Sequence, residues 1–129
     1  MDKKRILIVE DEESLRNILA DKLKEEDFDV DTAQDGKRGL DKALKDHPDL
    51  MLIDVMMPIM DGVEMIKNLQ KDSWGKNAKM MLLTNMSDPI KMAEITSELD
   101  GNLTVFDYLV KSDWDLDSIV KKIKDKFKD

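Results

Sequence analysis

Five short runs of apolar and β-branched residues punctuate this 129-residue chain, and longer stretches with helical spacing separate them. The runs are Ile6 to Val9, Phe28 to Ala33, Leu50 to Ile53, Met80 to Leu83 and Val105 to Val110. Alternation of this kind is typical of α/β domains, in which right-handed crossover helices join parallel strands. The sequence therefore predicts five parallel strands connected by helices.

The composition of each run indicates the place of its strand in the sheet. The first, third and fourth runs are continuously apolar, as parallel strands buried on both faces are, so we expect them at the centre. Phe28 to Thr32 alternates apolar with polar residues, which favours an edge strand with one wet face. The prediction is a doubly wound five-stranded parallel sheet in the order 2-1-3-4-5, which places a ligand beyond the carboxyl ends of the strands where the order reverses.

Amphipathic spacing predicts the helices between the strands. The second helix, Gly36 to Lys45, should end at His47-Pro48, because proline disfavours helix in the residue before it. A fourth helix should begin near Ser87-Asp88-Pro89 and end at Gly101, and Ser112-Asp113 should cap the last helix. The apolar residues expected to face the sheet are Leu15, Ile18, Leu19, Leu23, Leu40, Ala43, Leu44, Val63, Ile66, Leu69, Leu116, Ile119, Val120, Ile123 and Phe127.

Composition excludes several classes of protein. There is no cysteine, which excludes a disulfide framework, a zinc finger and a thiol nucleophile and suits a reducing cytoplasm. The formal net charge of −8 has the wrong sign for direct binding to nucleic acid. No apolar run approaches the roughly 20 residues that a membrane span needs, so we expect no membrane insertion. A chain below about 150 residues is expected to form a single domain.

Polar residues gather where the predicted strands end. Glu10-Asp11 follow the first strand, Asp54 the third, Thr84 the fourth and Lys111 the fifth. In the order 2-1-3-4-5 the first and third strands are neighbours, so the three carboxylates should share one pocket. Carboxylates so close either stay partly protonated or are neutralised by a cation, and oxygen ligands without histidine or thiolate favour Mg²⁺.

The same site is also expected to bind a phosphoryl group, because Mg²⁺ readily accepts a phosphate oxygen as a ligand. Lys111 would supply a positive charge and Thr84 a hydroxyl donor to the phosphoryl oxygens. Asp54, projecting from a buried strand, is the best-placed nucleophile for attack on phosphorus.

The chain resembles the response-regulator receiver domains of two-component signalling, also called CheY-like, over its whole length. The segment from Asp54 to Gly62, DVMMPIMDG, is similar to the phosphoacceptor strand and following loop of that family. The acidic pair Glu10-Asp11, Leu82-Leu83-Thr84 and the run from Asp107 to Lys111 match in register. The resemblance implies the flavodoxin-like (βα)5 fold and one receiver domain over residues 1–129 without an effector domain.

The resemblance also implies roles for single residues. Asp54 would accept a phosphoryl group from a histidine kinase or phosphotransfer protein. Glu10, Asp11, Asp54 and the backbone carbonyl of Met56 would bind Mg²⁺. Thr84 and Lys111 would bind the phosphoryl oxygens.

For the output, the resemblance implies that Thr84 shifts toward the phosphate while Tyr108 turns inward. The fourth helix, fifth strand and fifth helix would then present a changed surface to a downstream protein target or a phosphorelay partner. A cytoplasmic switch of this kind, monomeric or weakly dimeric when phosphorylated, is expected rather than an enzyme with steady turnover.

Three other functions share parts of this pattern. A nucleotide-binding or oxidoreductase domain would need a glycine-rich first turn, where this chain has Glu10 to Glu13. An aspartate-nucleophile phosphatase often has a second acid two residues after its nucleophile, where this chain has Met56. An inactive receiver-like binding module would lack Asp54, an acid of the first turn or Lys111, and all are present. The choice between a chemotaxis and a relay role stays open.

Overall fold

The computed structural model describes residues 3–55, 57, 59–84, 105–110 and 115–127. The helix expected between Ser87 and Gly101 lies outside the described residues. The elements, in chain order, are β1 (Arg5–Val9), α1 (Glu13–Glu25), β2 (Asp29–Ala33), α2 (Gly36–Asp46), β3 (Leu50–Asp54), α3 (Gly62–Leu69), the 3₁₀ helix η1 (Gly75–Asn77), β4 (Met80–Thr84), β5 (Val105–Val110) and α5 (Leu116–Lys126).

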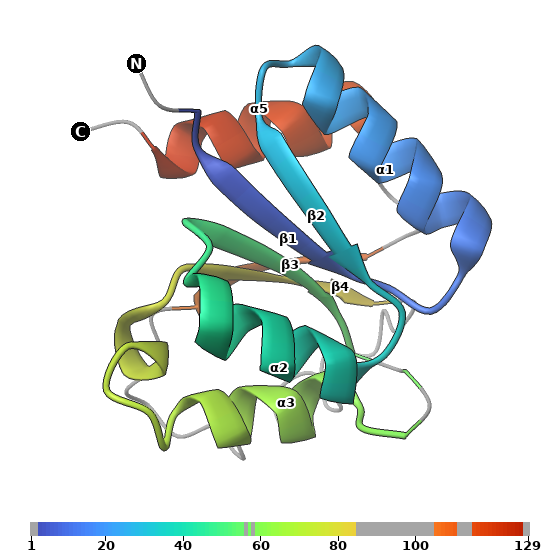
Figure 1. Ribbon diagram of the computed structural model, residues 1–129. Helices are drawn as coiled ribbons and strands as arrows, with labels where there is room; N and C mark the ends of the chain where they lie inside the picture. The colour runs from blue at the N-terminus through green and yellow to red at the C-terminus, as the bar shows by residue number, and fades with distance from the viewer. Residues whose placement is uncertain (1–2, 56, 58, 85–104, 111–114, 128–129) are drawn as a thin grey trace.

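The five strands form one parallel sheet in the order β2-β1-β3-β4-β5, which confirms the predicted order (Figure 1). The continuously apolar strands β1, β3 and β4 lie inside the sheet, and β2 lies at one edge. In β2, Asp29 and Asp31 are exposed and Val30 between them is half-buried, as the alternation predicts. Because β1 and β3 are parallel neighbours, Glu10, which follows β1, and Asp54, which ends β3, lie at the same carboxyl end of the sheet.

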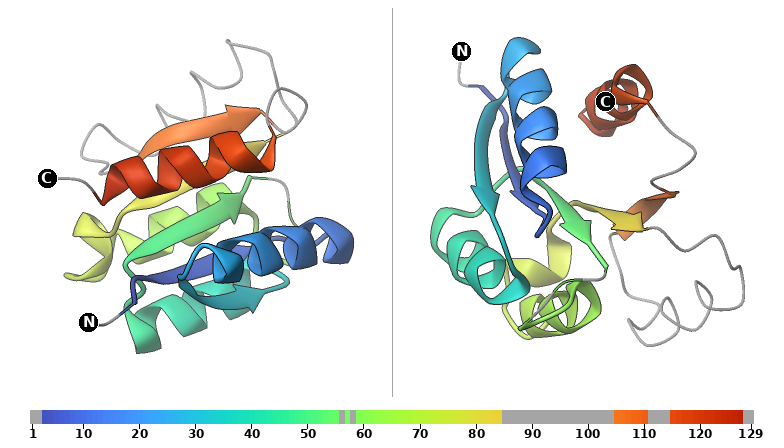
Figure 2. Two further views of the ribbon diagram at one scale, coloured as in Figure 1. Left: turned by 90° about the horizontal axis from the view of Figure 1, so that it is seen from above. Right: turned by 90° about the vertical axis from the view of Figure 1, so that its right-hand side faces the viewer.

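Helices cover both faces of the sheet. Figure 2 shows α1 and α5 on one face and α2 and α3 on the other. Two apolar cores result: one joins the sheet to α2 and α3 through residues such as Leu40, Met65 and Ile66, and the other joins it to α1 and α5 through residues such as Leu23 and Ile123. Every residue of β3 is buried, because the strand has a core on each side. Among the described residues, no helix has the length and apolar character needed to cross a bilayer.

Two apolar residues expected in the core are exposed instead. Ile18 of α1 is 49% exposed and Leu44 of α2 is 37% exposed. In α1 the buried arc runs through Leu19, Ala20 and Leu23, so Ala20 takes the place that the pattern had given to Ile18. At about 100° per residue, position 18 lies too far round the helix from this arc. The spacing gave no way to distinguish the two, because both residues flank Leu19 and are apolar.

The helix boundaries follow local chemistry. The Asp35 side chain caps α2 by accepting a hydrogen bond from the Arg38 backbone N–H. The helix ends at Asp46, directly before His47-Pro48, as predicted, and His47 adopts a left-handed conformation with a φ of 50°. The His47 ring stacks on Trp74 with centroids 4.4 Å apart. The cap expected for the last helix at Ser112-Asp113 is wrong. Asp115 caps α5 by accepting from the Ser118 N–H, because it stands directly before the first helical residue.

Candidate metal centre

Three carboxylates converge at the carboxyl end of the sheet. Glu10, Asp11 and Asp54 each offer an oxygen, and these oxygens lie within 4.8 Å of one another. Glu10 is fully buried, Asp54 is 3% exposed and Asp11 is exposed. Two of the three carboxylate residues are thus buried, and the third is in contact with solvent.

The sheet register explains why these side chains meet. Val9, the last residue of β1, pairs with Ile53 of β3, so that Glu10 and Asp54 occupy the next level of two neighbouring strands. The Glu10 backbone N–H donates to the Ala33 carbonyl of β2 at 3.0 Å, which continues the ladder one residue beyond β1. Asp54 ends β3 and is held on its other side by the register with Leu83 of β4. Main-chain pairing therefore fixes both buried acids.

The turn after β1 has its own hydrogen bonds. The Glu12 N–H donates to Glu10 Oε2 at 3.0 Å. Arg16, one turn into α1, donates from Nη1 to the carbonyl oxygens of Glu10 at 2.9 Å and of Asp11 at 3.4 Å. Glu12, the residue before α1, makes no side-chain cap. The turn that carries two of the three carboxylates is therefore held by side chains from its own segment.

The loop after Asp54 turns back over the strand. The Gly62 N–H donates to the Val55 carbonyl at 3.0 Å, and the Asp61 side chain caps α3 by accepting from the Glu64 N–H at 2.9 Å. Ile59 has a φ of 70° and is 80% exposed. A β-branched residue at positive φ is a backbone outlier, and such strain costs on the order of 1–3 kcal/mol.

The donor set fits a hard divalent cation. All three side chains offer carboxylate oxygens, and three negative charges at this spacing repel one another unless a positive ion offsets them. The single histidine, His47, lies at the end of α2 and is absent from the cluster. Oxygen ligands, one of them on an exposed residue, match the preference of Mg²⁺, which keeps several waters and binds through one or two carboxylates. The arrangement can thus hold such an ion beside Asp54.

Of the other predicted site residues, the structure describes only the backbone of Thr84 and Tyr108. Met56 and Lys111 lie outside the described residues. For Thr84 and Tyr108 the description covers the backbone: Thr84 ends β4, and Tyr108 lies in β5. Thr84 pairs with Val110, so the end of β4 and the end of β5 are level with each other. Their roles stay predictions.

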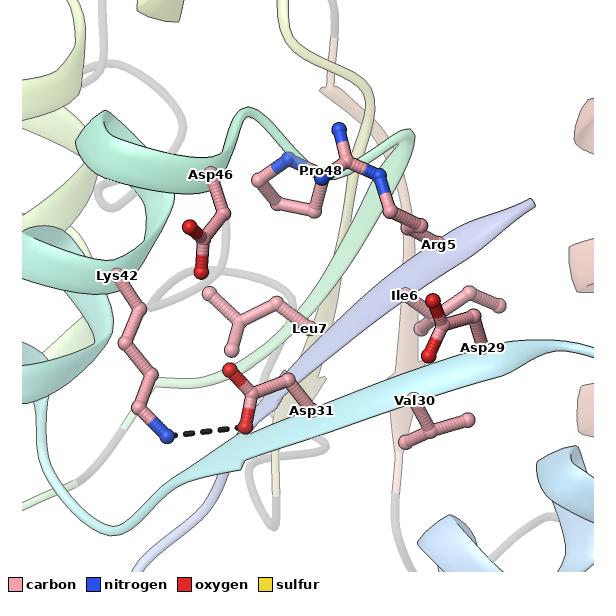
Figure 3. Close-up of a pocket in the computed structure, with 9 residues that line it drawn as sticks. All are labelled: Arg5, Ile6, Leu7, Asp29, Val30, Asp31, Lys42, Asp46 and Pro48. Carbon is pink, nitrogen blue, oxygen red and sulfur yellow. Dashed lines mark hydrogen bonds and ion pairs between the residues drawn. The ribbon is translucent and has the colours of Figure 1, made fainter. Parts of the chain in front are cut away.

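A separate hollow of about 290 Å³ lies along the first residues of β1 and β2, beside α2 (Figure 3). Lys42 reaches across it to Asp31 at 3.0 Å and to the Thr32 carbonyl. The residues of the acidic cluster take no part in its lining. The lining of this hollow carries both basic and acidic side chains, and two of them, Lys42 and Asp31, form an ion pair. Its charge is therefore mixed, whereas the side chains of the acidic cluster are all carboxylates.

Arg16 is a site residue that no motif pointed to. A lone arginine on an amphipathic helix normally indicates an exposed polar face. One signal was available: side chains on a helix lean toward its N-terminus, so an arginine in the first turn and a half can reach the turn before the helix.

Known proteins resemble this chain along most of its length. The sequence profile of the response regulator receiver domain matches residues 6–124. The response regulator ArlR of Staphylococcus aureus is 34% identical over 121 residues, which cover 93% of this chain and 51% of ArlR. The chain therefore spans about half the length of the curated relatives it matches.

Solved structures show the same fold. The chemotaxis response regulator CheY4 of Vibrio cholerae aligns with a TM-score of 0.84 and 29% identity, covering 95% of this chain and 98% of CheY4. TrrA of Thermotoga maritima, solved in complex with Mg²⁺-BeF, aligns with a TM-score of 0.77 and 33% identity, covering 95% of this chain and 97% of TrrA. With its fold, its acidic cluster and these matches, the chain belongs to the response regulator receiver domain family of two-component signalling.

Proposed function

We propose that this receiver domain is a magnesium-dependent phosphoacceptor and that Asp54 is the residue phosphorylated. The observation that carries the proposal is the convergence of Glu10 and Asp11 with Asp54 at the carboxyl ends of two central strands. In the transfer, an Asp54 carboxylate oxygen bonds to the phosphorus of a phosphohistidine as the P–N bond breaks. The imidazole leaves with the electron pair of that bond and takes up a proton.

The chain's own carboxylates would hold the metal ion. Glu10, Asp11 and Asp54 would bind Mg²⁺ through their clustered carboxylates, as family resemblance also implies. The Met56 carbonyl would be a further ligand, and that assignment rests on the resemblance alone. When bound, Mg²⁺ supplies positive charge that offsets the carboxylates and the phosphoryl oxygens. The TrrA complex with Mg²⁺-BeF supports this assignment by similarity.

Thr84 and Lys111 complete the proposed site at the ends of β4 and β5. Thr84 would donate a hydrogen bond to one phosphoryl oxygen, and Lys111 would offset the charge of another. The level ends of β4 and β5 support this placement. Phosphorylation would then bias Thr84 and Tyr108 between two arrangements and change the surface formed by the fourth helix, β5 and α5.

The partners follow from this chemistry. A histidine kinase or a phosphotransfer protein would donate the phosphoryl group, and a downstream protein or relay partner would bind the changed surface. The chain would act as a switch that promotes its own phosphorylation and slow dephosphorylation, because Met56 occupies the position where related phosphatases often have a second acid.

The test is phosphorylation by a small acyl phosphate, followed by intact mass measurement. We expect one phosphoryl adduct on the wild-type chain with Mg²⁺, none with excess chelator and none on Asp54→Asn. Asp61→Asn is the matched control: it makes the same chemical change in the loop after β3, and asparagine still caps α3. An adduct that persists on Asp54→Asn, or that forms equally with chelator, contradicts the proposal. Continuous release of phosphate from simple esters would indicate a phosphatase instead.

A further inference from the structure

The Arg16 side chain, which comes from α1, binds the turn that carries Glu10 and Asp11. We propose that Arg16 is a positioning residue for magnesium binding, which holds the two carboxylates in place through their own backbone carbonyls. The inference rests on the proposed function, because it concerns the same metal ion. Arg16 itself touches neither the metal ion nor the phosphoryl group.

The contact geometry supports this role. Arg16 Nη1 has two hydrogens, and its two acceptors are the carbonyl oxygens of consecutive residues, at 2.9 Å for Glu10 and 3.4 Å for Asp11. Fixing two successive carbonyls fixes the peptide plane between the two Cα atoms from which the ligand side chains project. The directions in which the two Cα–Cβ bonds leave this plane are then restricted before an ion binds.

A second described hydrogen bond within this turn is made by Glu10 itself. Glu12, the residue before α1, makes no side-chain cap, and its N–H donates to Glu10 Oε2. That bond engages an oxygen of the predicted metal-binding carboxylate itself. Arg16 instead binds main-chain oxygens, so the ordering it provides does not occupy a carboxylate oxygen.

The charge of Arg16 has the opposite effect to its hydrogen bonds. A guanidinium near the pocket repels a divalent cation, so a role through charge alone would mean that removal of Arg16 tightens Mg²⁺ binding. A positioning role means that its removal weakens binding, because the carboxylates must then be ordered at the expense of binding free energy. The sign of the change in affinity separates the two roles.

Arg5 provides a matched control at the other end of β1. Its Nη2 donates to the His47 carbonyl at 2.7 Å, which is the same kind of guanidinium-to-carbonyl bond. Arg5 is the first residue of β1, whereas Glu10 follows its last. Arg5→Gln and Arg16→Gln therefore remove the same charge and the same type of bond, and only the second change touches the acidic turn.

The experiment is calorimetric titration of the metal-free full chain with Mg²⁺. We expect Arg16→Gln to weaken Mg²⁺ binding roughly tenfold, in the range found when groups that orient metal ligands are removed. Arg16→Lys should recover part of this loss, because an ammonium can still donate to a carbonyl. Arg5→Gln should bind as the wild type does. Equal or tighter binding by Arg16→Gln, or equal weakening by Arg5→Gln, would overturn the assignment.

A second measurement needs no metal. In the metal-free protein, hydrogen exchange at the Glu12 amide should be faster in Arg16→Gln than in the wild type, while the amides of β3 keep their protection. Unchanged exchange at Glu12, or faster exchange throughout β3, would show that Arg16 does not act on the turn locally. Failure of the wild type to take up Mg²⁺ contradicts the proposed function; normal uptake by the wild type and by Arg16→Gln contradicts only the role of Arg16.

Discussion

Gly62 lies so close to Asp54 that a Cβ atom on the glycine would overlap the Asp54 backbone carbonyl oxygen. The first residue of α3 thus rests directly on the end of β3. The obstructing atom belongs to the backbone of a buried strand, so it cannot move aside as a flexible side chain would. Space for the helix next to the candidate phosphoacceptor therefore depends on the absence of a side chain at position 62.

Gly62→Ala is expected to destabilise the fold by about 1–3 kcal/mol, the usual cost of overpacking. It should also displace Asp54 and lower the rate of phosphorylation by acyl phosphate. Urea denaturation and intact mass measure the two effects. Glu64→Ala, at an exposed position in the same helix turn, should stay within about 0.5 kcal/mol of the wild type. A Gly62→Ala protein of wild-type stability would contradict the tight packing.

Asp11→Asn should stabilise the metal-free protein and remove its stabilisation by Mg²⁺. The change takes one charge from three clustered carboxylates, and one such repulsion is worth up to roughly 1 kcal/mol at 4 Å in a water-like medium. Mg²⁺ at ten times its Kd should stabilise the wild type by about 1.4 kcal/mol and should not stabilise the variant. Urea denaturation with chelator and with Mg²⁺ checks both.

Asp21→Asn is the control for Asp11→Asn, because it changes the net charge equally at an exposed position on α1 outside the cluster. It should respond to Mg²⁺ as the wild type does. Equal metal-free stability of Asp11→Asn and Asp21→Asn would show that the clustered charges do not repel one another measurably.

Ile59→Asn should raise stability by about 0.5–1 kcal/mol, because asparagine tolerates the left-handed conformation that costs an ordinary residue roughly 1–2 kcal/mol. Little apolar burial is lost, since Ile59 is 80% exposed. Ile59→Val keeps the β-branch and should leave stability unchanged. Thermal unfolding compares the three proteins, and equal melting temperatures for Asn and Val at position 59 would argue against backbone strain there.

The contact between Glu26 and Lys124 should make stability depend on pH. Lys124 Nζ donates to Glu26 Oε1 at 2.6 Å and joins the end of α1 to α5. This hydrogen bond, and then the lysine charge, hold the pKa of Glu26 below its usual 4.5. A carboxylate with a lowered folded-state pKa stabilises the fold above pH 4.5, and the contribution is lost as the pH falls through the folded-state pKa.

Lys124→Met should therefore lower the free energy of unfolding at pH 7. Below the folded-state pKa of Glu26, the difference in this free energy between the variant and the wild type should be smaller. Denaturation curves recorded between neutral and acid pH measure this convergence. Lys122→Met removes a charge from an exposed position of the same helix and should give a difference that does not depend on the Glu26 titration. A Lys124→Met difference that stays constant with pH would rule out the coupling.

The sequence predicted those parts of the fold that depend on local pattern. Continuous apolar runs correctly predicted that β1 and β3 lie inside the sheet, because a strand buried on both faces is apolar at every position. Alternation correctly predicted that β2 lies at the edge, because a strand buried on one face has apolar residues at every second position. The meeting of Glu10 with Asp54 followed from strand order, since both residues stand at strand ends.

Other features depend on contacts between segments that the pattern does not record. The exposure of Ile18 and Leu44 depends on how α1 and α2 are rotated on the sheet, which a broad apolar stripe leaves open. The stacking of His47 on Trp74 joins residues 27 positions apart (74 − 47). The Arg16 contact depends on the path of a single turn. Each of these is set by geometry that forms only when the chain is packed.

Borohydride reduction of the phosphorylated chain, followed by peptide mapping, is the most direct test of Asp54 as the phosphoacceptor. Borohydride converts an aspartyl phosphate into homoserine and so marks the modified position. We expect homoserine at position 54 after treatment with acyl phosphate and Mg²⁺, and unmodified Asp54 when the ion is chelated. Homoserine at Asp11, Asp61 or another carboxylate in place of 54, or equal labelling of Asp54 without Mg²⁺, would contradict the account.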